Sequence, residues 1–190
     1  MNKQVNLSTI PSFEEAVAFH GHACPGLAMG YRVAIAAMSR LQVTRAEDED
    51  LVAIVENDAC SVDAVQLVCG CTFGKGNLIF RDHGKQAYTF FNRTTKQGFR
   101  IYIEPPTMDN PHKNETERFS PDDERHQLID SLLHLPEEDL LHITETQEPA
   151  PAKARIHAAV RCDVCGERIM ETRAVQADGK TLCVPCHVSL

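Results

Sequence analysis

The chain has 190 residues, of which 43% are hydrophobic and 24% are charged, and it contains no tryptophan. This composition predicts one main domain with a small additional module; it excludes disordered and fibrous classes, and no apolar run approaches the roughly 18 residues of a membrane span. The net charge of −8 is uneven, because residues 1–151 carry 13 basic and 23 acidic side chains whereas residues 152–190 carry 6 and 4. The acidic first part argues against general nucleic-acid binding. Because the N-terminus lacks an apolar signal segment, we expect a cytoplasmic protein that does not contact a membrane.

Hydrophobic periodicity and turn residues predict alternating helices and strands. Ser12 and Ser61 are the expected N-caps of two helices, because acidic residues follow each of them in the first turn, where the helix dipole favours anions. Turn residues between the three central strands predict an antiparallel meander, and a polar, proline-rich loop is expected from Pro105 to Pro121. The expected elements in chain order are a helix ending at His20, a helix from Pro25 to Leu41, a strand at Leu51–Val55, a helix from Ser61 to Gly70, strands at Asn77–Arg81, Gln86–Phe91 and Phe99–Ile103, a helix from Asp122 to Leu135 and a short helix reaching Ile143.

This order of elements predicts an α+β fold in which helices pack on a mainly antiparallel sheet. After it, the segment 144–157 contains acidic residues, two prolines and few apolar side chains, which is typical of a surface linker. We therefore expect a core domain over residues 1–143, a linker over 144–157 and a C4 zinc finger over 158–190.

The C-terminal module contains two Cys-x-x-Cys pairs separated by seventeen residues. Four thiolates at this spacing hold a tetrahedral Zn²⁺ and leave no open coordination position, which predicts structural rather than catalytic zinc. A hairpin at Asp178-Gly179 would bring the second pair beside the first, as in a treble-clef or ribbon finger. About thirty residues need the ion for their stability. The predicted ligands are Cys162, Cys165, Cys183 and Cys186.

A second group of imidazoles and thiols lies in the main body. These donors suit Zn²⁺ or another borderline transition metal, and three protein ligands with one water would make an open site. Asp58 or Asp63 would orient a ligand through a hydrogen bond. The alternative is structural: the histidines cap helices, and the cysteines are small buried side chains. The predicted core ligands are His20, His22, Cys24 and Cys60.

Two residues are candidates for direct chemistry. Cys60 precedes a predicted helix, where a thiolate is favoured, so it is either a ligand or a nucleophile. Lys75 lies in a glycine-rich loop, but only three residues separate its glycines and Gly76 replaces the Mg²⁺-binding hydroxyl of a phosphate loop. We therefore predict no nucleotide hydrolysis. Lys75 would instead hold a small anionic ligand, the alternative being an ordinary turn lysine.

Three segments of the core together resemble the FmdE family of formylmethanofuran dehydrogenase in its longer form, which ends in a zinc finger. The resemblance implies an α+β core that pairs into an intertwined homodimer, with a metal-binding cleft where two of the segments meet. Nothing in the chain resembles the pterin-binding or iron–sulfur components of such an enzyme, so dehydrogenase activity is not carried over. The segments are His20-Gly-His22-x-Cys24-Pro-Gly, Asp58-Ala-Cys60-Ser-Val-Asp63-Ala-Val-Gln66 and Gly70-Cys71-Thr72-Phe73-Gly74-Lys75-Gly76-Asn77-Leu78.

The leading hypothesis is a metal-binding protein of this family, with a transition metal in the core and a finger that contacts a partner. A second hypothesis is a zinc-finger regulator or sensor whose finger contacts nucleic acid or protein, since the tail is weakly positive. A third is a metal-dependent hydrolase or transferase, which needs an open coordination position at the core ion. The sequence alone specifies neither a substrate nor a larger molybdenum or tungsten enzyme complex.

Overall fold

The structure is a computed structural model that describes residues 10–104 and 121–189. The chain divides into a first unit up to Lys153 and a second from Ala154 onward. Among the described residues, none of the helices combines the length and the apolar character needed to cross a membrane. The loop predicted from Pro105 lies outside the described residues, except for Pro121, where a helix begins.

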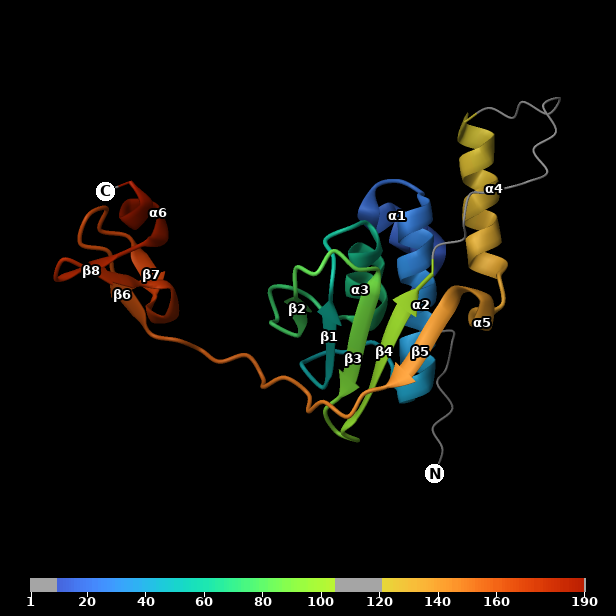
Figure 1. The fold of residues 1–190 in the computed structure, drawn as a ribbon, viewed down its shortest axis with the longest axis horizontal. Helices are drawn as coiled ribbons and strands as arrows, with labels where there is room; N and C mark the ends of the chain where they lie inside the picture. The colour runs from blue at the N-terminus through green and yellow to red at the C-terminus, as the bar shows by residue number, and fades with distance from the viewer. Residues whose placement is uncertain (1–9, 105–120, 190) are drawn as a thin grey trace. The chain divides into compact units, whose positions relative to one another are not determined.

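The first unit is a five-stranded sheet with helices against it (Figure 1). Its first helix has the expected cap at its N-terminus: the Ser12 hydroxyl accepts a hydrogen bond from the Glu15 amide, and the Glu15 carboxylate accepts one from the Ser12 amide. This capping box satisfies two amides that the first turn leaves free. The elements are α1 (Phe13–His20), α2 (Pro25–Leu41), β1 (Leu51–Val55), α3 (Ser61–Cys69), β2 (Leu78–Phe80), β3 (Ala87–Asn92), β4 (Gln97–Ile103), α4 (Pro121–His134), α5 (Glu137–Leu140) and β5 (Leu141–Glu145).

The strand order β2-β1-β3-β4-β5 confirms a mainly antiparallel sheet and corrects the predicted meander. β3 and β4 form an antiparallel hairpin, with Tyr88 opposite Ile101. β2, however, pairs with β1 in parallel, with Ile54 opposite Ile79, and does not pair with β3. The physical reason is α3, which lies between β1 and β2 in the chain and makes the crossover that a parallel pair requires.

The end of the first unit also differs from the prediction. α5 ends at Leu140, and the expected continuation of the helix to Ile143 is wrong, because these residues form the edge strand β5. β5 pairs with β4 in the antiparallel sense, and Ile143 packs against the core while His142 is exposed. This alternation is a strand period, and three residues were too few to reveal it in the sequence.

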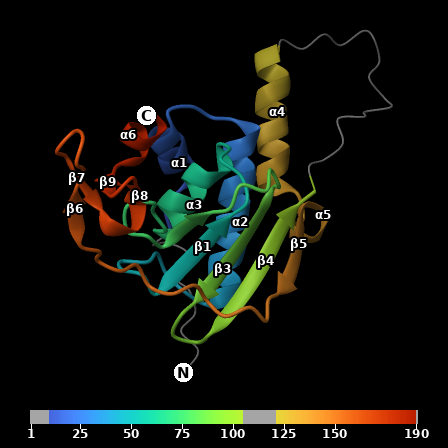
Figure 2. The same ribbon diagram turned by 60° about the vertical axis from the view of Figure 1, so that its left-hand side comes forward.

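α2 and α3 lie against one face of the sheet, as the turned view in Figure 2 shows. The core between them consists mainly of small and aliphatic side chains, together with Tyr88 and Phe90 from β3. On the opposite face, Phe91 packs with side chains of β1, and Ala150 covers this small cluster. Arg93 holds the covering segment by donating to the Pro151 and Ala152 carbonyls.

The second unit contains two small hairpins and a terminal helix. Asp178 and Gly179 both have positive φ, 49° and 73°, which is the conformation that a two-residue hairpin turn requires. The hairpin expected at this Asp-Gly pair is therefore present. The elements are β6 (Ala159–Arg161), β7 (Arg168–Met170), the short 3₁₀ helix η2 (Glu171–Arg173), β8 (Val175–Ala177), β9 (Lys180–Leu182) and α6 (Val184–Val188).

Candidate metal centres

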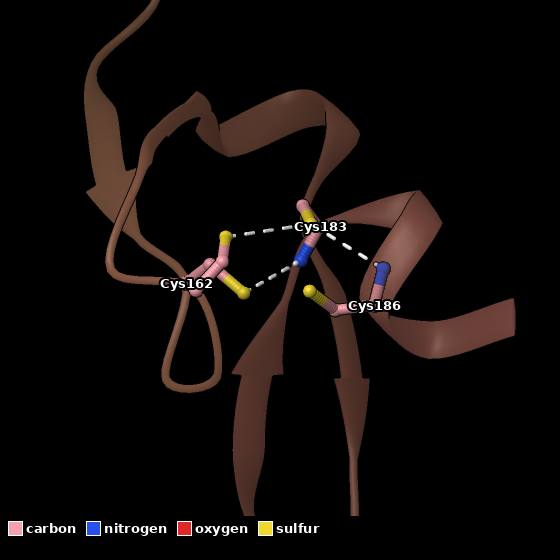
Figure 3. Close-up of side chains that lie close together, drawn as sticks. Cys162, Cys183 and Cys186 are labelled. Carbon is pink, nitrogen blue, oxygen red and sulfur yellow. Dashed lines mark hydrogen bonds between the residues drawn. The ribbon is translucent and has the colours of Figure 1, made fainter. Parts of the chain in front are cut away.

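The four cysteines of the second unit converge. Their sulfur atoms all lie within 4.8 Å of one another. Figure 3 shows sulfur atoms of this cluster facing each other, with dashed amide-to-sulfur hydrogen bonds. The first pair lies on the turn between β6 and β7; in the second pair, Cys183 caps α6 and Cys186 lies inside that helix. A zinc-binding turn followed by a hairpin and a ligand-bearing helix is the treble-clef arrangement.

The geometry and electrostatics of this cluster fit Zn²⁺. The sulfur atoms of Cys165 and Cys183 are 3.9 Å apart, close to the roughly 3.8 Å expected for two sulfurs bound to one tetrahedral zinc at about 2.3 Å. Amide groups of Cys165 and Cys183 lower the pKa of Cys162 to about 6. The neighbouring Cys183 thiol raises the pKa of Cys186 to about 12, because several thiolates cannot share this space without a cation. This is a structural zinc site with four protein ligands.

A second cluster lies where α1 turns into α2. Gly21 ends α1 with a φ of 96°, a left-handed conformation that favours glycine, and reverses the chain immediately after His20. Cys24 is then the N-cap of α2, and its sulfur accepts a hydrogen bond from the Leu27 amide at 3.3 Å. This tight connection places donor atoms of His20, His22 and Cys24 within 4.8 Å of one another.

Within this cluster His20 is held at both ring nitrogens. Its Nδ1 lies 2.6 Å from the Asp63 carboxylate of α3, and its Nε2 lies 3.9 Å from the Cys24 sulfur. A nitrogen and a sulfur bound to the same tetrahedral zinc are roughly 3.6 Å apart, so the second distance suits two ligands of one ion. A carboxylate on the far nitrogen of a ligand histidine fixes the ring and its tautomer. Of the two aspartates considered from the sequence, Asp63 therefore lies against a predicted ligand, and Asp58 is exposed.

Cys60 lies beside Cys24 but outside the tight three-residue group. It occupies the N-cap of α3 and packs in the small cluster that contains Cys24 and Leu27. Burial, followed by the neighbouring Cys24 thiol, raises the pKa of Cys60. The structure thus brings all four predicted core residues to one region, with His20, His22 and Cys24 nearest to one another.

The turn that carries Cys60 rests on a buried polar network that the sequence did not predict. Ser61, the expected N-cap, is instead the first residue of α3, and its hydroxyl accepts a hydrogen bond from Tyr88 at 2.5 Å. Asn57 donates to the Tyr88 hydroxyl and accepts from the Ala59 amide. Because Tyr88 belongs to β3, this network fixes the Cys60 turn to the sheet. The only signal in the sequence was a pattern of polar residues with no obvious partner.

Two glycines of α2 allow this turn to approach. A Cβ atom at Gly30 would lie 2.2 Å from the Ser61 carbonyl oxygen and 2.5 Å from its Cα. At Gly26 it would lie 3.3 Å from the Cβ of Cys60. The helix that begins after Cys24 and the helix that begins after Cys60 therefore approach to backbone contact, which places the two thiols side by side.

The remaining residues considered from the sequence lie elsewhere. Lys75 follows the C-terminal end of α3, and its ammonium donates to the carbonyls of Ala46, Glu47 and Asp48 at 3.0, 3.3 and 3.3 Å. Since Cys60 is at the opposite end of α3, roughly 13 Å away along the helix, the structure does not bring Lys75 into the cluster.

Cys69 and Cys71 belong to the core, as the sequence suggested. Both are fully buried, and burial raises the pKa of each thiol, that of Cys71 to about 12. Cys71 donates to the Leu51 carbonyl at 3.6 Å, and Cys69 lies 4.0 Å from the Ala34 carbonyl. These thiols are protonated packing groups and not ligands.

The chain matches known proteins over both units. Residues 19–142 match the family described as "FmdE, Molybdenum formylmethanofuran dehydrogenase operon", and residues 157–189 match the "Prokaryotic dksA/traR C4-type zinc finger". A crystal structure of an FmdE-like protein of tungsten formylmethanofuran dehydrogenase from Syntrophus aciditrophicus has a TM-score of 0.66 and 26% identity, and the match covers 94% of each chain. The fold and the cysteine clusters define a metal-binding α+β protein with a zinc finger. More specifically, the chain belongs to the FmdE family.

A curated relative extends the comparison to Archaeoglobus fulgidus. It is named "Probable S-adenosyl-L-methionine-binding protein" and is 33% identical over 192 residues. The match includes 90% of this chain but 51% of the relative, so the chain spans about half the length of that protein. What the relative binds through its remaining half is therefore a property of that protein.

Proposed function

We propose that the core unit binds one transition-metal ion, such as Zn²⁺, through His20, His22 and Cys24, with Cys60 as an additional ligand. The observation that carries this proposal is the set of three donor atoms within 4.8 Å of one another, one of them on a ring held in place by Asp63 at 2.6 Å. Nitrogen and thiolate donors select borderline metals over Mg²⁺ or Ca²⁺, which prefer oxygen.

The exposure of the cluster supports a role beyond stability. Cys24 is buried and His20 is partly covered, whereas His22 is exposed. Solvent and a small anionic ligand therefore reach the cluster from the His22 side. A bound ion would supply Lewis-acid chemistry there. The part of the protein is to fix the His20 ring through Asp63 and to hold Cys24 at the start of α2.

Elemental analysis of the purified full chain tests the proposal. The wild-type protein should contain two metal ions per chain, one in each unit. The double variant His20→Ala/His22→Ala should lose one of them and keep the zinc of the finger, whereas Cys162→Ser should lose the other. His134→Ala is the matched control, since its side chain is 75% exposed on α4, and it should retain both ions. A wild-type chain with a single ion that Cys162→Ser removes would refute the core site.

An enzymatic role, as a metal-dependent hydrolase or transferase, requires an exchangeable position on the core ion. The three-residue cluster supports this second candidate, since three protein ligands leave such a position. Cobalt replaces zinc and gives absorption bands that respond to coordination. Addition of azide should change the bands of the core ion and leave those of the four-cysteine site unchanged. Bands that stay constant would remove the enzymatic proposal and leave a binding protein.

We further propose that the finger contacts a protein partner. Val164, Met170, Val184 and Val188 are more than half exposed on it, and the surplus of two positive charges on residues 152–190 is small for a nucleic-acid-binding surface. Retention on immobilised DNA or RNA that disappears with rising salt would instead support the nucleic-acid regulator.

The resemblance to the FmdE family also leads us to propose a homodimer. Phe19, Phe73 and Phe80 are 55%, 77% and 45% exposed on the first unit, which is apolar surface that a second copy would cover. Light scattering on the full chain should give twice the mass of one chain, and a monomer at micromolar concentration would contradict the proposal.

A further inference from the structure

Cys24 and Cys60 form a pair of thiols that is separate from the other thiols of the first unit. A Cβ atom built on Gly26 would lie 3.9 Å from the Cys60 sulfur and 4.0 Å from the Cys24 sulfur. The two sulfurs therefore border the same small space, which exists because residue 26 has no side chain. Both residues also pack in the same apolar cluster.

The helices around the pair keep it together. Each cysteine is the N-cap of a helix, α2 for Cys24 and α3 for Cys60. These two helices touch at Gly30, where a Cβ atom would overlap the backbone of Ser61. The thiols are thus brought together by backbone packing and remain neighbours whether or not an ion is bound.

The two thiols differ in exposure and in hydrogen bonding. Cys24 is 7% exposed and accepts a hydrogen bond from the Leu27 amide. Cys60 is more exposed, and its side chain makes no capping hydrogen bond. A small oxidant therefore reaches Cys60 first and finds Cys24 immediately behind it.

We propose that Cys24 and Cys60 are a redox-active pair that closes reversibly into a disulfide, with a peroxide as the oxidant. The Cys60 sulfur attacks one oxygen of hydrogen peroxide, the O–O bond breaks, and Cys60 becomes a sulfenic acid with release of one water. The Cys24 sulfur then attacks the Cys60 sulfur, the S–O bond breaks, and the second water leaves. Two thiols are oxidised by two electrons, and one peroxide is reduced to two waters.

Closure of this disulfide would also release the core ion, an extension that rests on the proposed function. Thiolate is the form of cysteine that binds a metal. In the disulfide neither sulfur is a thiolate, which leaves His20 and His22 as the remaining ligands of the cluster. Reduction by a dithiol restores both ligands, so oxidation and metal binding exclude each other.

Peptide mapping of the full chain tests the pair directly. Reduced, zinc-loaded protein is treated with one equivalent of hydrogen peroxide, and free thiols are then alkylated in denaturant with a chelator. Digestion after arginine, lysine, aspartate and glutamate yields the peptide Ala59–Asp63, which contains Cys60 without Cys69 or Cys71. The expected product is this peptide joined by a disulfide to the peptide that contains Cys24. The four finger cysteines should appear alkylated.

Variants identify the linkage. Cys60→Ser and Cys60→Ala should abolish the joined peptide, whereas Cys69→Ser, which alters a fully buried thiol of the same helix, should leave it unchanged. Two results would overturn the proposal: alkylation of both Cys24 and Cys60 after peroxide treatment, or joining of Cys60 to any cysteine other than Cys24.

Metal analysis of the same samples separates the two proposals. If both hold, peroxide halves the metal content, and reduction with added zinc restores it. If the joined peptide forms in a chain that never held more than one ion, the thiol pair is confirmed and the core metal site fails. If two ions are present and persist after the disulfide has formed, the release of metal by oxidation is wrong.

Discussion

Gly30→Ala is a one-methyl perturbation at the contact between α2 and α3. The added Cβ would lie 2.2, 2.5 and 2.7 Å from the carbonyl oxygen, Cα and carbonyl carbon of Ser61, whereas ordinary contacts begin near 3.4 Å. All three atoms are backbone, so no side chain can rotate away. The helices must separate by about 1 Å, since close-packed interiors have no space to absorb the methyl group.

The cost follows from two opposing contributions. Inserting a methyl group into a packed core costs about 1–3 kcal/mol and sometimes more, and the backbone overlaps place this site at the upper end. Replacing glycine by alanine inside a helix returns about 1 kcal/mol. A net loss of about 2–3 kcal/mol in the free energy of unfolding remains, which lowers the melting temperature of a unit of this size by roughly 4–12 °C.

Thermal and urea unfolding followed by circular dichroism measure this loss. Gly74→Ala is the matched control: no atom lies within 4 Å of its Cβ position and its φ is not in the left-handed region, so its stability should stay within about 0.5 kcal/mol of wild type. Gly26→Ala, with a nearest contact of 3.3 Å to the side chain of Cys60, should fall between the two. If Gly30→Ala is as stable as Gly74→Ala, the close contact between the helices is wrong.

Tyr88→Phe leaves the buried hydroxyl of Ser61 without its 2.5 Å donor, so urea unfolding should show a loss of about 1–3 kcal/mol; an unchanged midpoint would contradict the network. Burial raises the pKa of Glu56, but hydrogen bonds from Arg100 and His83 outweigh it and hold this pKa below its usual value. The resulting stability is present above about pH 4.3 and disappears as the pH falls through the lowered folded pKa. Glu56→Gln should flatten the acid side of the pH–stability curve, and a parallel curve would argue against this account. Chelation should unfold the finger, seen as loss of its amide dispersion by NMR, whereas a finger that stays folded would show that zinc does not support it.

Local sequence rules were reliable wherever the chain determines its own geometry. The Ser12 cap, the proline at the start of α2 and the Asp-Gly hairpin of the finger each depend on a few neighbouring residues. The four-cysteine cluster follows from spacing alone, because two Cys-x-x-Cys turns need only a hairpin between them to meet. The convergence of His20, His22 and Cys24 was likewise visible, since five residues span the whole group.

Features that depend on distant partners were not visible in the same way. The parallel position of β2 beside β1 is set by the crossover through α3, which no turn signal marks. The alternation of β5 becomes meaningful only against β4, its neighbour in the sheet. Ser61 carries the residue type of a helix cap, but a tyrosine from β3 takes its hydroxyl. In each case a tertiary contact overrides a local preference.

The spacing of α2 and α3 and the core cluster are one structural property. Asp63 of α3 holds His20, which precedes α2, and Gly30 of α2 touches the backbone of α3 at Ser61, next to Cys60. An ion bound at the cluster would therefore join the ends of the same two helices that Gly30 brings into contact. Ligands that bind only the folded state stabilise it by mass action. Added zinc should consequently raise the melting temperature of the wild-type first unit more than that of Gly30→Ala, because the displaced helices no longer present the donors together.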